Sequence, residues 1–463
     1  MPILETAVPG ANSDLMMQAN AIRFRAPRPQ REYRFREVLA GLSVALDLGE
    51  GHAPGHAQRS ALIGLRLATN LGLAPEERES LLHTLLLKDA GCSGNASVIT
   101  RVLGIDDHHA KRLMRGQARG EWPVAKMSEW HPIVSRLRRL SRSTGPKLAR
   151  EFSRLRSEAG TRAAIAATGD PQAAAGIASL DERWDGSGYP DGRRAEEIPM
   201  NARIASLAQT IDVVHAALGL DGVLDFVQAR RGVWFDPSMA DVCATWRHDR
   251  LWWHDLAYEP QALPESEHDR ILDEDDLDRV ADAFALVIDG KNPYAPGHSQ
   301  GVARVAEGIG SYLGYEGAGL RGLHRAALLH DLGNLGLSSR ILDKAAPLSD
   351  EERDAMMEHP RFTWSILRRV DAFEDIGWAA ALHHERLDGS GYPWGLAENE
   401  QDIDARIIAI ADAYQAVTEI RSYREGISPD GAIRIIGKDS PHRYDARVFR
   451  ALETWIADPS SRP

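Results

Sequence analysis

The sequence predicts an all-α protein, and three observations support this prediction. From Arg36 onward, apolar residues recur at spacings of three and four, which is the period of a helix with one buried face. Runs in which apolar and polar residues alternate, as in half-buried strands, are almost absent. Glycine and proline fall between the helical segments rather than inside them. We therefore expect a bundle of helices joined by loops.

Length and composition limit the class of protein. A chain of 463 residues is too long for one ordinary core and predicts two or three domains. No apolar run approaches the roughly 18 residues of a membrane span, and no basic segment followed by an apolar one opens the chain. Cys92 and Cys243 lie far apart without CxxC spacing, so we expect neither a disulfide framework nor a thiolate metal site. These features predict a cytoplasmic protein without a membrane segment.

The net charge of -12 disfavours binding to long nucleic acid, whose phosphates would be repelled. A small phosphorylated ligand is still compatible with this charge, because bound metal ions can reverse the field around a site.

An internal repeat divides the chain into two related copies. Residues 53–56 (Ala-Pro-Gly-His) recur at 295–298, and residues 182–190 recur almost unchanged at 385–393. Two further blocks repeat in the same order, which chance does not supply. Extra residues in the first copy separate two of its blocks, and we assign them to a basic insert at 115–145.

We predict the following division of the chain: a loose tail at 1–32, a first helical domain at 33–245, a connector at 246–278, a second helical domain at 279–455 and a tail at 456–463.

The second copy contains a set of metal-ligating residue types, mostly beside apolar helical stretches: His298, the adjacent His330 and Asp331, His359, the adjacent His383 and His384, and Asp412. Taken alone, each is more often a cap, a core histidine or a surface residue. Three of these positions share one pattern, an apolar helix that runs into a His or an Asp. Converging helix ends are how a bundle builds an internal metal site, and imidazole with carboxylate suits iron, manganese or zinc.

The first copy serves as an internal control. It keeps His56 and Asp89, but Lys88 replaces His330 and Gln209 replaces Asp412. Leu180 and Asp181 stand at the positions of His383 and His384, and no histidine matches His359. The candidate ligands are lost together while Gly-Ser-Gly-Tyr-Pro is kept. We therefore predict a metal site in the second copy and a fold without metal chemistry in the first.

The second copy resembles the HD-GYP family, a branch of the HD phosphohydrolase superfamily, and the first copy resembles a degenerate domain of the same type. The resemblance rests on these residues: 296–299, 330–333, 358–360, 383–393, 411–412 and 421–424. It implies two tandem HD-type helical bundle domains.

The resemblance also implies chemistry. It suggests a bacterial signalling phosphodiesterase that hydrolyses cyclic di-GMP to the linear dinucleotide or to GMP. The implied cofactors are two divalent metal ions, iron or manganese, with Asp331 bridging them. The implied metal ligands are His298, His330, Asp331, His359, His383, His384 and Asp412, with His330 and Asp331 as the catalytic pair. Gly391, Tyr392 and Pro393 would form the loop beside the substrate.

One departure from the family leaves alternatives open. The family usually has Lys, a phosphate contact, where this chain has Asn334, and an amide brings no charge. A catalytically weak or inactive module that binds a cyclic dinucleotide or a protein therefore stays open, as does a phosphohydrolase for another nucleotide. Arg386 and Arg424 are candidate phosphate or guanine contacts, although a solvated helix face explains either equally well. A homodimer or a signalling partner also stays open.

Overall fold

The structure is a computed structural model that describes residues 32–103, 106–108, 111, 145–258, 263–266, 269–292, 296–419 and 426–458. Nearly all of its elements are helices, so the all-α prediction is confirmed. Within the described residues, the strands are β1 (Tyr33–Arg34) and β2 (Ile271–Leu272), which pair antiparallel.

The elements of the first half follow the chain in this order: α2 (Phe35–Glu50), α3 (His56–Asn70), α4 (Pro75–Leu87), α5 (Ser93–Leu103), α8 (Gly145–Thr168), α9 (Pro171–Ala178), η2 (Ala195–Glu197), α10 (Met200–Gln228), α11 (Pro237–Ala244) and η3 (Thr245–His248). The η labels mark 3-10 helices. Those of the remainder are α12 (Arg250–Tyr258), α13 (Glu274–Lys291), α14 (His298–Tyr312), α15 (Gly317–Leu329), η4 (Leu332–Gly336), α16 (Ser339–Leu342), α17 (Asp350–Met356), α18 (His359–Leu367), α19 (Glu374–Ala381), η5 (Glu398–Glu400), α20 (Ile403–Thr418), α21 (Pro429–Ile436) and α22 (Ala446–Ala457).

The domain boundaries stay a prediction, and two helices run across them. Helix α13 begins at Glu274, inside the predicted connector, because Asp273 caps it by accepting a hydrogen bond from the backbone N–H of Asp276. Helix α22 continues to Ala457, two residues past the predicted end of the second domain. Almost all of the predicted tail at 1–32 and of the predicted basic insert lies outside the described residues.

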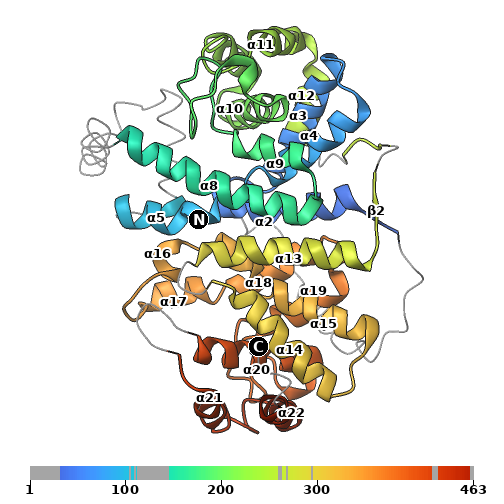
Figure 1. Cartoon of the computed structure of the whole chain (residues 1–463), viewed down its shortest axis with the longest axis vertical. Coiled ribbons are helices and arrows are strands. Elements are labelled where there is room, and N and C mark those ends of the chain that lie inside the picture. The colour runs from blue at the N-terminus through green and yellow to red at the C-terminus, as the bar shows by residue number, and fades with distance from the viewer. Residues whose placement is uncertain are drawn as a thin grey trace.

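The two halves pack against each other through α2 and α8 of the first half and α13, η4 and α18 of the second. Figure 1 shows α8 and α13 side by side across the middle of the molecule, and these two helices are in contact. Helix α2 of the first half in turn contacts η4 and α18 of the second. The buried apolar side chains form one core that runs through both halves, from Leu39 and Leu46 on α2 to Ile288 on α13 and Leu335 on η4. This continuous core fixes the position of each half on the other.

Local sequence explains where the site helices begin. In α14, the carboxylate of Asp289 accepts hydrogen bonds from the backbone N–H and the hydroxyl of Ser299, at 3.1 and 2.6 Å. Gly297 precedes the helix with φ of 78°, a left-handed conformation that glycine adopts without strain. His298 is therefore held in the first turn. A capping box starts α17, because Ser349 and Glu352 bond each other's backbone N–H.

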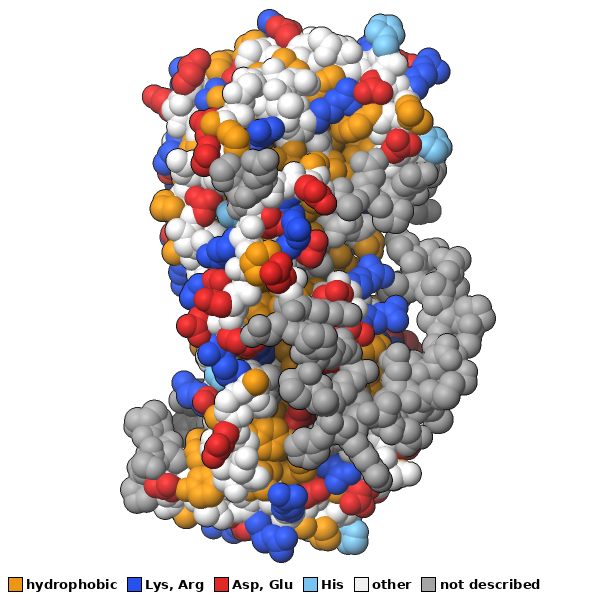
Figure 2. Space-filling view, turned by 90° about the vertical axis from the view of Figure 1, so that its right-hand side faces the viewer, with side chains coloured by type: hydrophobic (Ala, Val, Ile, Leu, Met, Phe, Trp, Pro, Cys, Tyr) orange, Lys and Arg blue, Asp and Glu red, His pale blue; other side chains and the backbone are white. Residues whose placement is uncertain are grey.

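The surface carries mixed charge. On the face shown in Figure 2, acidic and basic side chains are interspersed over the described residues. Among those residues, no helix combines the length and the apolar character that a membrane span requires.

Candidate metal centre

The structure brings all seven predicted metal ligands together from five parts of the second copy. They are His298 in the first turn of α14, His330 and Asp331 between α15 and η4, His359 at the start of α18, His383 and His384 after α19, and Asp412 in α20. Each belongs to at least one group of three side chains whose ligand atoms lie within 4.8 Å of one another. His330 directly follows α15, and His383 and His384 follow α19 after one residue. All three therefore lie at helix ends that face the cluster.

Asp331 lies at the centre of this cluster. One carboxylate oxygen, Oδ2, is 3.4 Å from Nε2 of His330. The other, Oδ1, is 3.3 Å from Nε2 of His359 and 3.7 Å from Nε2 of His383. The two oxygens of Asp331 therefore face different histidines, His330 on one side and His359 with His383 on the other.

Three histidines are oriented by the same backbone contact. Nδ1 of His330, His359 and His383 each lies 2.7 Å from a backbone carbonyl oxygen three residues earlier, on Ala327, Met356 and Ala380. Since Nδ1 donates its proton to that carbonyl, the lone pair on Nε2 faces the cluster. A hydrogen bond of this kind fixes the tautomer and the ring of a metal-ligating histidine.

His298 and Asp412 form the second side of the cluster. Nε2 of His298 is 3.2 Å from Oδ1 of Asp412, and Nδ1 is 3.0 Å from Oε1 of Glu419. Asp412 also lies 4.0 Å from Nδ1 of His384. The sequence interpretation placed Asp412 at the end of a helix, and this was wrong. Helix α20 continues to Thr418, and the acid stands within it because its side chain faces the cluster.

Burial and neighbouring charges tune the protonation of these groups. Burial lowers the pKa of His383 and His384 well below the usual value, and the surrounding imidazoles lower it further. Burial opposes ionisation of Asp331, but His330 and His359 outweigh it and hold the pKa of Asp331 well below its usual range. Burial also opposes the charged form of His298 and His330, but Asp412 with Glu419 beside His298, and Asp331 beside His330, outweigh it and raise the pKa of both histidines. The two sides of the cluster therefore differ in protonation, and a metal ion would displace the protons from His298 and His330.

The donor set fits a cation. Nε2 of His330 is buried and has no hydrogen-bond partner among the described residues. Nε2 of His359 and Nε2 of His383 face each other at 3.2 Å, although both rings donate from their other nitrogen. Facing lone pairs repel unless a positive charge lies beside them. Nitrogen and oxygen donors of this kind suit iron, manganese or zinc.

The predicted substrate loop borders the cluster. The ring of Tyr392 lies 4.6 Å from that of His384, and its backbone N–H donates to the carbonyl of His384 at 3.2 Å. Glu385 holds the loop by accepting hydrogen bonds from the backbone N–H groups of Trp394 and Leu396. A Cβ on Gly391 would lie 2.4 Å from the backbone nitrogen of Arg386, so this position requires glycine.

The remaining predicted substrate contacts lie in different surroundings. The guanidinium of Arg386 lies 4.8 Å from the ring centre of Tyr444 and also donates to the carbonyl of Glu385. Asn334 lies three residues after Asp331, and its buried side-chain oxygen has no hydrogen-bond partner in the described part of the chain. The carbonyl of Pro393 accepts a hydrogen bond from Arg361. Arg424 lies outside the described residues.

In the first copy, built-in cations surround the matching aspartate. The Nζ of Lys88 is fully buried and bonds Oδ2 of Asp89. The guanidinium of Arg156 lies 2.9 Å from Oδ1 of Asp89 and 3.0 Å from Oδ1 of Asp181. His52, His56 and Asp89 have ligand atoms close enough to hold a metal. However, both oxygens of Asp89 already bond cations, so a metal ion would be repelled there.

A comparison with protein families shows to which family the chain belongs. The HD domain family model matches residues 151–239 and 283–448, which together make up more than half of the chain. The chain belongs to the HD domain family. The two matched stretches fall in the two copies, and the predicted resemblance of the second copy to the HD-GYP branch is confirmed.

Similar proteins in this family cleave cyclic dinucleotides. The chain is 34% identical over 438 residues to the 3'3'-cGAMP-specific phosphodiesterase 3 of Vibrio cholerae, covering 92% of this chain and 95% of that one. A crystal structure of a cyclic GMP-AMP-specific phosphodiesterase from V. cholerae superposes with a TM-score of 0.62 at 30% identity, over 94% of this chain and 100% of that one. The cyclic di-GMP phosphodiesterase response regulator of Xanthomonas campestris is 34% identical over 153 residues, 33% of this chain and 40% of that protein.

Sequence reasoning missed two residues of this arrangement. Glu419 orients His298, and a carboxylate seven residues after Asp412, directly after the last residue of α20, was the available signal. Arg156 stands at the first-copy position that corresponds to His359. The spacing between the repeated blocks predicts this correspondence, but we looked only for a histidine there and did not consider an arginine.

Proposed function

We propose that the second copy is a metal-dependent phosphodiesterase that cleaves a cyclic dinucleotide. The observation that carries the proposal is the position of Asp331, whose Oδ2 faces His330 while its Oδ1 faces His359 and His383. Such a donor set supports a pair of divalent ions, with iron or manganese as the first candidates. His298, His330 and Asp412 would hold one ion, and His359, His383 and His384 the other, with Asp331 shared between them.

Two divalent ions in these positions would supply a nucleophile from water at neutral pH and neutralise charge on the phosphate. The residues of the chain prepare the site for that chemistry. The backbone carbonyls behind His330, His359 and His383 orient each ring so that Nε2 faces the cluster, and the low pKa of Asp331 keeps its carboxylate ionised. Tyr392 lies against His384 at the edge of the cluster, where it can contact the substrate.

The substrate to test first is 3'3'-cGAMP. The relative named for this substrate matches both copies over nearly its whole length. The X. campestris relative named for cyclic di-GMP matches only about a third of this chain. Cyclic di-GMP, the substrate that the sequence motifs predict, is the second candidate.

A non-enzymatic nucleotide-binding module is the alternative function. The observation that favours it is Asn334, which brings no charge to a position where the family usually has Lys.

The test is a turnover assay on the full chain with Mn²⁺ or Fe²⁺, in which 3'3'-cGAMP, cyclic di-GMP and a linear dinucleotide are compared. We expect linear products from a cyclic dinucleotide and a loss of turnover in His330→Ala. The matched control is His324→Ala, which removes a histidine of the same helix whose partner is Glu307, outside the cluster. Nucleotide binding without turnover in the metal-loaded protein would support the alternative.

A further inference from the structure

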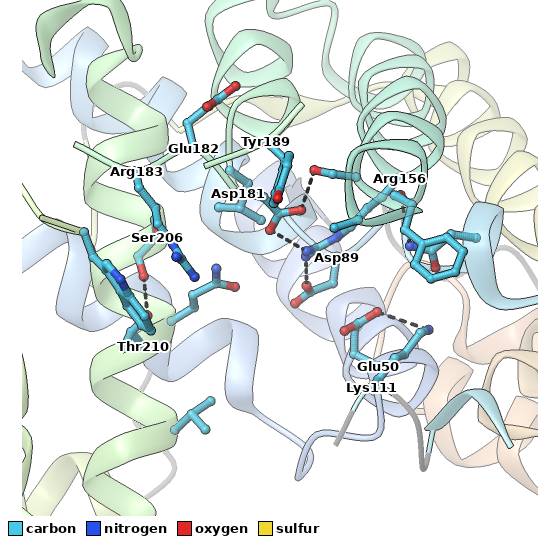
Figure 3. A pocket seen from close by; sticks show the side chains of 18 of the residues that line it. Glu50, Asp89, Lys111, Arg156, Asp181, Glu182, Arg183, Tyr189, Ser206 and Thr210 are labelled. Atoms are coloured by element: carbon cyan, nitrogen blue, oxygen red, sulfur yellow. Dashed lines mark hydrogen bonds and ion pairs between the residues drawn. The ribbon is translucent and has the colours of Figure 1, made fainter. Parts of the chain in front are cut away.

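The first copy contains a cavity of about 380 Å³ at the position that corresponds to the metal centre (Figure 3). Its walls come from α3, α8, α10 and the loop that follows α9. The volume is in the range of small-molecule sites. The first copy therefore lacks most of the second copy's candidate metal ligands but keeps an open pocket.

The acidic side chains of this pocket are already satisfied. Asp89 bonds Lys88 and Arg156, Asp181 bonds Arg156, and Glu50 lies 3.1 Å from Nζ of Lys111. Glu182 also borders the pocket, but Figure 3 shows it pointing away from the centre. Its carboxylate accepts hydrogen bonds from the backbone N–H groups of residues 191–193. Among the described residues that line the pocket, every acidic side chain thus already has a partner other than a ligand.

Arg183 is the cation of this pocket that lacks an acidic partner. Its guanidinium stacks on Trp234, 4.2 Å from the ring centre, and points into the pocket in Figure 3. No ion pair joins it to an acid in the part of the chain that the structure describes. An arginine that is held on an aromatic face and faces a cavity is suited to a phosphate group.

His56 supplies a second polar contact. The side chain is 1% exposed, and Nδ1 lies 2.7 Å from Oδ2 of Asp212. Because Nδ1 donates to that carboxylate, Nε2 is left as an acceptor, and it is buried without a hydrogen-bond partner. It borders the pocket, where a ribose hydroxyl would satisfy it.

The rest of the lining offers an apolar wall. Phe152 and Tyr189 border the same pocket. By the internal repeat, Tyr189 corresponds to Tyr392 and Arg183 to Arg386. The first copy has therefore kept Tyr189 and Arg183, while the cations Lys88 and Arg156 stand where the second copy has His330 and His359.

We propose that this pocket binds a nucleoside monophosphate and does not hydrolyse it. The phosphate pairs with Arg183, a ribose hydroxyl donates to Nε2 of His56, and the base lies against the aromatic wall. The site is separate from the metal centre, so the proposal holds whether or not the second copy cleaves a cyclic dinucleotide.

The test is equilibrium dialysis of GMP and AMP against the full chain in EDTA, with inorganic phosphate and guanosine as comparison ligands. We expect Arg183→Ala to weaken one class of sites by about 10- to 100-fold, as for the loss of a charged hydrogen bond. Arg183→Lys should restore part of the affinity. Arg386→Ala, the matched change in the second copy, should leave this class of sites unchanged.

Hydrogen exchange on the wild-type chain tests the proposal without a variant. GMP or AMP should slow exchange in residues 180–190 more than in residues 383–393. The proposal is overturned if protection falls only on the second copy, if Arg183→Ala binds both nucleotides as tightly as the wild type, or if inorganic phosphate binds as tightly as GMP. Turnover by the second copy is measured separately, so a failure here is distinguishable from a failure of the phosphodiesterase.

Discussion

Arg156 of the first copy occupies the place that His359 occupies in the second. A Cβ on Gly91 would lie 1.9 Å from the carbonyl oxygen of Arg156, and a Cβ on Gly333 would lie 1.9 Å from that of His359. Both residues therefore stand at the same point beside the turn that carries the paired aspartate. One copy presents a guanidinium there and the other an imidazole. In the first copy the guanidinium of Arg156 neutralises Asp89, whereas in the second copy the imidazole of His359 leaves Asp331 able to bind a metal ion.

The close contact at Gly333 predicts a strong effect of a single methyl group. Gly333→Ala would force α18 away from η4 and displace His359 from Asp331. We expect metal affinity and turnover to fall by about 10-fold or more, as when a ligand loses its support. Metal titration followed by a turnover assay measures this change. Gly322→Ala is the control, because its added Cβ comes no nearer than 3.7 Å to another residue.

Asp47 predicts a pH dependence of stability. Burial raises its pKa to about 7, although Lys88 opposes the shift. The folded state therefore binds a proton between pH 4 and 7 that the unfolded state releases, so stability falls as the pH rises through this window. Between pH 5 and pH 8 the wild type should lose about 2–3 kcal/mol more than Asp47→Asn. Urea unfolding at both pH values measures this, and equal losses in the two proteins would contradict the assignment.

A buried ion pair joins the two halves. Nζ of Lys291 on α13 is 2.7 Å from Oδ2 of Asp107, whose Oδ1 accepts a hydrogen bond from the backbone N–H of Ser339. Asp107→Ala would leave Lys291 buried without its acid, at a cost of about 3–5 kcal/mol in the free energy of unfolding. The double variant Asp107→Ala/Lys291→Met should cost less than Asp107→Ala alone. A double-mutant cycle in urea checks this, and additive costs would show that the pair contributes nothing.

Replacing Asn334 with lysine should increase the affinity for the cyclic dinucleotide. The side-chain oxygen of Asn334 is buried without a partner, and a lysine at this position would bring a positive charge close to Asp331. For Asn334→Lys we expect a KM about 10-fold lower, because a charged hydrogen bond to phosphate replaces a neutral one. Steady-state kinetics on 3'3'-cGAMP separates KM from kcat. An unchanged or higher KM would mean that this position does not face the phosphate.

The sequence alone predicted much of the second copy. The repeat made it possible to compare His330 with Lys88, and the losses in the first copy singled out the ligand positions. All seven of those positions meet in one cluster because the helices that carry them converge. Asp412 was misplaced on its helix, since an apolar run that meets a polar residue does not reveal whether the helix ends there or turns that residue inward.

Other features depended on contacts that a linear pattern does not encode. The pairing of Asp107 with Lys291 joins residues from different halves, and neither lies in a repeated block. The pocket around Arg183 depends on how α8, α10 and a loop pack together. Neither feature could be predicted without knowing how these segments pack in three dimensions.

The most direct test measures metal content and turnover on the same anaerobically purified full chain. We predict about two divalent ions per chain and conversion of 3'3'-cGAMP to linear products. Both should be lost in Asp331→Asn and kept in the control His324→Ala. A folded wild-type protein that binds no metal, or one that is fully loaded and cleaves neither 3'3'-cGAMP nor cyclic di-GMP, would contradict the account.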